Sequence, residues 1–374
     1  MPIYMDRHDV SQQVTAEIVA RLHQQDLKIQ DQFKCKGMTY WFDEKRKAAF
    51  CLVEAPSKKA IQKMHRFAHG DVPNQIIEVQ PELIESFLGR IKDPEKVQGA
   101  GLNIINDSAF RTIMVIELKA FSHKPIGITS SGSLRPRFTN TVYKKLKASD
   151  GSVVNRTENH FLVSFQSVSK AVKAALEIDY LFNSLQARYT GGRLSLKMGL
   201  AAGAPITGRK PIFEDTIKAA ERMCLAVHGR IIASPEVRAL YDSENPKCLA
   251  DNGNVVSITE KDEDFLTRLF DYIESAGCDS NLKIDDLTKP LACSKSQMYR
   301  KMVALTGKSP QAFIKEYRLR KALTLLNRQS VNVLEVAYRC GFTSPSYFSK
   351  CFRKMYGCSP SDIVPGSFQS GVTS

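Results

Sequence analysis

The chain has 374 residues, of which 43% are hydrophobic and 25% are charged, and its formal net charge is +14. This length predicts two or three domains, and the composition is typical of soluble globular proteins. No run approaches about 18 apolar residues and the first residues do not resemble a signal peptide, so we expect neither a membrane span nor export. Nine cysteines, an odd number without a Cys-x-x-Cys pair, favour a cytoplasmic protein over a disulfide scaffold.

Residues 1–80 alternate between strand and helix patterns. The predicted strands cover residues 3–8, 38–42, 48–53 and 75–79, and the predicted helices cover residues 15–32 and 57–69. This βαββαβ order predicts an α+β, ferredoxin-like front domain with two helices on one face of the sheet. Within residues 81–107, we expect a short helix at 81–91 that packs back on this domain, followed by a linker.

The histidines gather in this front domain, which holds four of the seven in the chain. His65 and His69 are four residues apart and therefore share a helix face. His8 ends the first strand, and Cys51 lies in the middle of the third. Imidazole and thiolate suit transition metals such as nickel, zinc or copper. The candidate ligands are His8, His23, Cys51, His65 and His69; alternatively, Cys51 is a small buried apolar residue and the histidines lie at the surface.

Several short motifs carry a resemblance in this region. They are Met5-Asp-Arg-His8, His23-Gln-Gln-Asp-Leu27 with Gln30, Trp41-x-Asp43, and Phe50-Cys-Leu-x-Glu-Ala-Pro56 followed by His65. Together they resemble a family of small ferredoxin-like proteins that includes nickel-binding members. The resemblance covers most of residues 1–80 and implies a metal site that uses some of the five candidate ligands, with a transition metal such as nickel as the expected cofactor.

Residues 108–258 show a second α/β pattern. Strands are predicted at 112–116, within a hairpin at 153–165, and at 194–201 and 230–234, with helices at 170–188 and 217–227. Blocks at 116–122, 151–165, 197–203, 215–222 and 229–234 resemble the catalytic domain of class III nucleotidyl cyclases. This resemblance implies a cyclase-like α/β fold for the middle domain.

This sequence departs from that family at positions that carry the family's catalytic chemistry. The resemblance puts the two metal-holding aspartates at Glu117 and Asn159 and the transition-state asparagine at Lys218, while Arg222 keeps the arginine. A neutral Asn159 is a poor Mg²⁺ ligand, and phosphoryl transfer depends on charge neutralisation by the ions. We therefore expect no enzyme activity, and a domain that binds a small molecule or pairs two chains into a homodimer. The alternative is an active nucleotidyl cyclase fused to a DNA-binding domain.

Residues 262–362 contain two helix-turn-helix patterns in tandem, which predict an all-α domain; residues 363–374 form a tail. In the first pattern, a stripe at residues 284–291 precedes a helix capped by Ser294. A connecting helix begins at Ser309-Pro310. In the second pattern, a helix is predicted at residues 331–340, followed by a turn at Gly341 and a second helix that begins at Ser344.

The residues that point outward on the second helix of each pattern are candidates for reading DNA bases. They are Ser296, Gln297, Tyr299, Arg300, Ser346, Tyr347, Ser349 and Lys350. Arginine can bind guanine and glutamine can bind adenine through two hydrogen bonds each. Between Lys295 and Lys354 there are thirteen basic and two acidic residues, a net charge of +11, as phosphate contact requires. The alternative is a helical bundle with a solvated basic face.

This region resembles the DNA-binding domain of AraC/XylS-type bacterial transcription regulators. The matching segments are residues 299–301, 305–310, 317–322, 337–342 and 347–352. The resemblance implies sequence-specific binding of two segments of double-stranded DNA about 34 Å apart, and contact with RNA polymerase if the protein is an activator. Pro290 departs from the family pattern and is expected to shorten or kink its helix. The whole chain is thus predicted to be a transcription regulator controlled by a metal or small-molecule signal.

Overall fold

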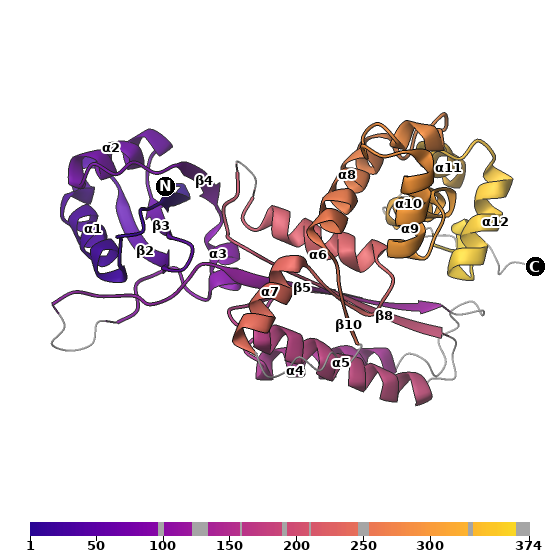
Figure 1. Ribbon diagram of the computed structural model, residues 1–374, viewed down its shortest axis with the longest axis horizontal. Helices are drawn as coiled ribbons and strands as arrows, with labels where there is room; N and C mark the ends of the chain where they lie inside the picture. The colour runs from indigo at the N-terminus through magenta and orange to yellow at the C-terminus, as the bar shows by residue number, and fades with distance from the viewer. Residues whose placement is uncertain are drawn as a thin grey trace, which may run out of the picture.

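The computed structural model describes residues 1–95, 101–121, 134–157, 159–188, 193–208, 211–245, 254–327 and 332–363. The chain forms two separate sheets and a helical C-terminal part, and the middle sheet lies between the front domain and the helical part (Figure 1). Within the described ranges, no helix combines the length and the apolar character needed to cross a membrane. Residues 96–100 of the predicted linker and 364–374 of the predicted tail lie outside the described residues.

The front sheet has the strand order β2-β3-β1-β4, with every neighbouring pair antiparallel. Its elements are β1 (Ile3–Asp9), α1 (Ala16–Ile29), β2 (Lys36–Asp43), β3 (Ala48–Glu54), α2 (Lys58–Ala68) and β4 (Gln75–Val79). Thr15 and Ser57 cap the two helices through their side chains, as short polar residues at this position do. The predicted ferredoxin-like topology is confirmed, although the first helix ends at Ile29 and continues only as a 3₁₀ turn.

The two faces of the front sheet have different partners. Because side chains alternate along a strand, Cys51 and Val53 pack toward α1 and α2, whereas Phe50 and Leu52 pack toward α3 (Pro81–Leu88). The same core takes in residues of the middle domain, such as Phe213. Helix α3 therefore packs on the front domain as predicted, and it also contacts strands β6 and β7 of the middle sheet.

The middle sheet has the order β10-β9-β8-β5-β7-β6. Its elements are β5 (Arg111–Phe121), α4 (Leu134–Ala148), β6 (Ser152–Arg156), β7 (His160–Phe165), α5 (Val168–Arg188), β8 (Arg193–Gly203), α6 (Glu214–Ala226), β9 (Ile231–Ala233), α7 (Pro235–Glu244) and β10 (Val255–Ser257). From β5 to β8 this repeats the βαββαβ order and the antiparallel pairing of the front domain. Strands β9 and β10 then extend the sheet in parallel.

Opposite faces of the middle sheet are covered by different helices. Met114 and Ile116 on β5 belong to a core with α4, α5 and α7, whereas Val115 between them belongs to a core with α6. Helix α6 lies very close to the sheet at Gly199, where an added Cβ would be 2.1 Å from the carbonyl oxygen of Ala220. Glycine at this position therefore permits the close packing of α6 on β8.

The C-terminal part consists of α8 (Glu260–Ala276), α9 (Lys295–Thr306), α10 (Pro310–Leu326), α11 (Val333–Arg339) and α12 (Pro345–Tyr356). The stripe predicted at residues 284–291 forms only a 3₁₀ turn, Ile284–Leu287, followed by further turns, which confirms the expected shortening near Pro290. Leu287 and Leu291 are nevertheless buried. Gly307 and Gly341 have φ angles of 69° and 79°, as the predicted helix end and turn require.

The two helix-turn-helix units belong to different cores. The first shares a continuous core with α6 of the middle domain, through α8 residues such as Phe265 and α9 residues such as Met298. The second forms its own core around Leu319, Phe348 and Phe352. The first unit is therefore packed onto the middle domain, whereas the second is packed mainly on itself.

Candidate functional site

A cluster of histidines and aspartates lies between the front sheet and its two helices. Strand β1 directs Asp6 and His8 toward the helices, and Cys51 on β3 pairs with Asp6 across the sheet. Helix α1 supplies Asp26. Helix α2 supplies His65 near its end, and His69 is its C-cap residue. These six residues form the cluster that we call the front-domain cluster.

The front-domain cluster is a chain of short contacts. Asp6 lies 3.4 Å from Nε2 of His8 through Oδ1 and 3.0 Å from Nε2 of His65 through Oδ2. Asp26 lies 3.1 Å from Nδ1 of His65 and 3.3 Å from Nε2 of His69. The cluster contains two groups of three, Asp6-His8-Cys51 and Asp26-His65-His69, and within each group the donor atoms lie within 4.8 Å of one another.

The donor atoms of both groups fit a transition metal. Nε2 of His8 and Oδ1 of Asp26 are buried and have ion-pair contacts at 3.4 and 3.3 Å but no hydrogen bond of good geometry, and such atoms are costly to bury unless something binds them. The nitrogen, sulfur and oxygen donors available here are those that nickel, zinc and copper accept. Each group therefore supplies one unsatisfied atom and a donor set suited to such an ion.

Charge pairing dominates the electrostatics of the cluster. Burial alone would raise the pKa of Asp6, but its close contacts with His65 and His8 hold it well below its usual range. The pKa of Asp26 is lowered in the same way by His65 and His69. Burial would lower the pKa of His65, but its bonds with Asp26 and Asp6 raise it to about 10. Burial, and then the nearby carboxylates, raise the pKa of Cys51, so a metal must displace protons to bind here.

These shifts predict how the stability of the metal-free protein varies with pH. The pKa of His65 rises from 6.5 to about 10 on folding, so its contribution is complete below pH 6.5 and is lost as the pH rises through 10. The pKa values of Asp6 and Asp26 are lowered from 3.8, so their contribution is lost as the pH falls below that value. We expect thermal unfolding with a chelator present to show a stability maximum between these limits. An alkaline decline that is equally steep in His65→Gln would contradict this assignment.

The structure brings together four of the five predicted ligands. The exception is His23, which is paired with Asp93 at 3.1 Å and packs beside Tyr40 with ring centroids 5.0 Å apart. Asp6 and Asp26 were not among the predicted ligands. Asp6 could have been found, because it lies two residues before His8 and therefore on the same face of the strand.

In the middle domain, the positions matched to cyclase residues lie in two separate places. Glu117 on β5 lies beside Asn159, since the backbone N–H of Leu118 donates to the carbonyl of Asn159 at 2.8 Å. Arg222 is buried and lies 2.6 Å from Asp271 of α8, with Glu274 at 3.4 Å. Its guanidinium therefore ties α6 to α8. Glu158 and Ser122 of the matched blocks lie outside the described residues.

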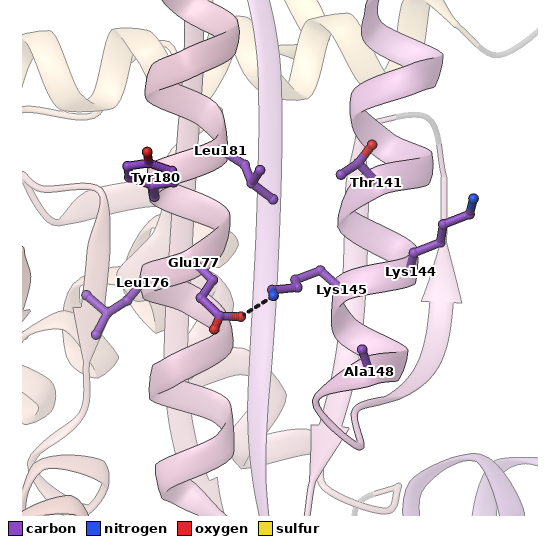
Figure 2. A pocket seen from close by; sticks show the side chains of 8 residues that line it. All are labelled: Thr141, Lys144, Lys145, Ala148, Leu176, Glu177, Tyr180 and Leu181. Atoms are coloured by element: carbon purple, nitrogen blue, oxygen red, sulfur yellow. Dashed lines mark ion pairs between the residues drawn. The ribbon is translucent and has the colours of Figure 1, made fainter.

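A groove between α4 and α5 has a volume of about 590 Å³. Figure 2 shows Lys145 of α4 reaching Glu177 of α5, with which it forms an ion pair at 2.8 Å. Leu176, Tyr180 and Leu181 line the rest of one wall. The groove lies on the face of the sheet opposite to α6 and the helical part, and its lining contains no cluster of catalytic or metal-binding side chains.

The predicted DNA-reading residues of α9 are exposed. Ser296, Gln297, Tyr299 and Arg300 all lie on the solvent side of the helix. Gln297 also has a second role, since its Oε1 accepts a hydrogen bond from the backbone N–H of Ser294 at 2.9 Å. This capping box leaves only the amide NH₂ of Gln297 free to donate to a base.

On α12, Ser346, Tyr347 and Lys350 are exposed and Ser349 is partly exposed. Not all of the surrounding basic residues are available to phosphate. The Arg318 guanidinium donates to the backbone carbonyls of Gly277, Asp279 and Gly341. Other basic residues are held by carboxylates: Lys308 and Arg320 by Glu316, and Lys301 by Asp262. Arg300, Lys350 and Lys354 form no ion pair with any residue in the described ranges.

Family models match both ends of the chain. Residues 287–364 match the model described as Helix-turn-helix domain. The C-terminal part is thus similar to known helix-turn-helix domains. Residues 4–79 match the model described as Nickel responsive protein SCO4226-like. The two resemblances predicted for the ends of the chain are thus confirmed, whereas neither model covers the middle domain.

Individual relatives match only parts of the chain. The HTH-type transcriptional activator RhaS of Escherichia coli is 35% identical over 82 residues, which are 22% of this chain and 30% of RhaS. Histidine kinase P4 of Formosa agariphila is 33% identical over 106 residues, or 28% of this chain and 8% of the kinase. The crystal structure of SCO4226 from Streptomyces coelicolor is 30% identical and covers 21% of this chain and 94% of SCO4226, with a TM-score of 0.20.

Proposed function

We propose that this protein is a cytoplasmic transcription regulator that binds double-stranded DNA and responds to a transition metal such as nickel. The observation that carries the proposal is the tandem helix-turn-helix domain, in which α9 and α12 both present exposed polar side chains from a basic surface. The front-domain cluster supplies the metal donors, and the front-domain match to a nickel-responsive family supports nickel. Sequencing of the DNA bound by the protein, with and without nickel, tests both parts of the proposal.

We further propose that the middle domain transmits the signal and has no cyclase activity. Arg222, matched to a cyclase catalytic residue, is occupied by Asp271 and Glu274 of the next domain. Asn159 offers an amide where a carboxylate would hold Mg²⁺. Formation of a cyclic nucleotide from ATP or GTP with Mg²⁺ or Mn²⁺ would overturn this reading. Pairing of two chains would double the phosphate contacts and steepen the salt dependence of DNA binding.

A series of contacts connects the front-domain cluster with the helix-turn-helix domain. Arg7 lies on β1 between Asp6 and His8, and because strand residues alternate its side chain points away from the cluster. Its Nη1 donates to the carbonyl of Ile206 at 2.8 Å. Ile206 lies in the loop that leads from β8 to α6, and α6 packs on α8. A metal that shifts β1 would therefore also move the contact at Ile206.

Replacing Arg7 with glutamine should uncouple the two sites. We expect nickel affinity and metal-free DNA affinity to stay within about twofold, while the effect of nickel on DNA affinity falls by a factor of about 2–30. DNA binding titrations with and without nickel measure this ratio. Arg21→Gln is the matched control, because Arg21 is exposed and pairs with the exposed Glu17 on the same helix, α1. An unchanged nickel effect in Arg7→Gln would exclude this route.

A further inference from the structure

Two cysteines far apart in the sequence meet where the two helix-turn-helix units join. Cys278 follows the end of α8 and is partly exposed, whereas Cys340 caps α11 and is buried. The two backbone segments are in contact, since a Cβ added at Gly341 would lie 2.6 Å from the carbonyl oxygen of Cys278. The two thiols are near enough for each to shift the pKa of the other.

Arg318 of α10 holds the two cysteine-bearing turns together. Its Nε donates to the carbonyl of Gly277 at 2.7 Å and its Nη1 donates to the carbonyl of Gly341 at 2.9 Å. The residues directly before Cys278 and directly after Cys340 are therefore fixed by one guanidinium. Such an arrangement keeps both sulfur atoms in place without a covalent bond.

We propose that Cys278 and Cys340 form a peroxide-sensitive dithiol that closes to a disulfide and lowers DNA affinity. The thiolate of Cys278 attacks one oxygen of hydrogen peroxide, the O–O bond breaks, and a sulfenic acid and hydroxide form. The thiol of Cys340 then attacks this sulfur, its S–H proton leaves with the sulfenic oxygen, and water departs. The two thiols lose two electrons in total, and the peroxide becomes two molecules of water.

The environments of the two sulfurs suit these roles. The neighbouring Cys340 thiol, followed by the positive charges of Lys321 and Arg318, holds the pKa of Cys278 well below its usual value. The neighbouring Cys278 and burial raise the pKa of Cys340. Because the thiolate is the reactive form, the partly exposed Cys278 is the attacking residue and the buried Cys340 is the resolving one.

Closing the disulfide must move the second DNA-reading helix. The two sulfur atoms have to approach to about 2.05 Å, which draws the turn at Gly341 toward the end of α8. Helix α12 begins a few residues later, at Pro345. Both recognition helices must fit successive grooves of one duplex, so this displacement disfavours binding. This part of the inference rests on the proposed DNA-binding function.

The test is peroxide treatment of the reduced full-length protein with a chelator present, followed by alkylation and peptide mapping. We expect a Cys278–Cys340 cross-link that a thiol reductant reverses, at a rate above that of any modification at Cys293 or Cys358. Cys278→Ser should prevent the cross-link, and in Cys340→Ser the sulfenic acid at Cys278 should persist and react with dimedone. The absence of the cross-link in wild type, or pairing of Cys278 mainly with another cysteine, would overturn the proposal.

DNA binding provides the second measurement. Oxidised wild type should bind its DNA site about fivefold or more weakly than reduced wild type, and Cys278→Ser should show no such difference. Unchanged affinity with the cross-link in place would overturn the switch. Reduced protein that binds no duplex at all would instead refute the proposed function, and the cross-link measurement would still stand by itself.

Discussion

Replacing His65 with glutamine should nearly abolish metal binding. His65 contacts both Asp6 and Asp26, at 3.0 and 3.1 Å, and is the residue that links the two candidate donor groups. Loss of an outer-shell partner alone typically costs about 10–100-fold in metal affinity, so loss of this residue should cost at least that much. Calorimetric titration with Ni²⁺ on purified full-length protein measures the effect.

His23→Gln is the matched control for this experiment. It removes a second buried histidine of the same domain, which pairs with Asp93 outside the cluster. We expect its nickel affinity to equal that of wild type, and an equal loss in both variants would remove the front-domain cluster as the site. Because His65→Gln takes one partner from each of two buried carboxylates and destabilises the domain, His69→Gln and Cys51→Ser provide milder variants. Each changes only one of the two donor groups and so identifies the one that binds the ion.

Replacing Arg300 with alanine should weaken binding to the specific DNA site and relax the base preference at one position. Arg300 is exposed on α9 and forms no ion pair with the described residues. Its guanidinium is therefore available to hydrogen-bond with guanine. A good two-hydrogen-bond contact contributes roughly 1–3 kcal/mol of discrimination, which corresponds to about 5- to 150-fold in affinity. Selection of bound sequences from a random library, compared between variant and wild type, measures both effects.

The adjacent residue supplies the control. Lys301 also carries a positive charge on α9, but its Nζ donates to the carbonyl of Lys261 at 2.8 Å and lies 3.3 Å from Asp262. It therefore points back toward α8. We expect Lys301→Ala to retain the wild-type base preference and to lose mainly stability. If Lys301→Ala alters the preference and Arg300→Ala does not, α9 presents a different face to DNA from the one assigned here.

The fold of both ends was predictable because local patterns there agree with one another. In the front domain, the helices begin at capping residues such as Thr15 and Ser57, and the observed sheet has the expected topology. In the C-terminal domain, Ser294 and Ser309 cap helices where the sequence indicated. Helix α4 was not predicted, and its sequence has Pro136 near the start and a weakly apolar face.

The candidate metal site was only partly predictable, because its geometry depends on contacts between distant segments. The spacing of His65 and His69 indicated a shared face, but Asp26 reaches them from another helix. His23 lies three residues before Asp26 on the same helix and nevertheless pairs with Asp93. Sequence spacing within a helix cannot distinguish these two outcomes, since they depend on how α1 is rotated against the sheet.

The first helix-turn-helix unit shares its core with the middle domain, which limits where the chain can be cut into fragments that fold independently. Phe265 and Leu269 of α8 are buried together with Met223 and Cys224 of α6. A recombinant fragment that starts at α8 would expose the apolar face of α8 to water and would tend to aggregate. Fusing the helix-turn-helix part to another protein would therefore succeed only if α6 and the strands that support it are included.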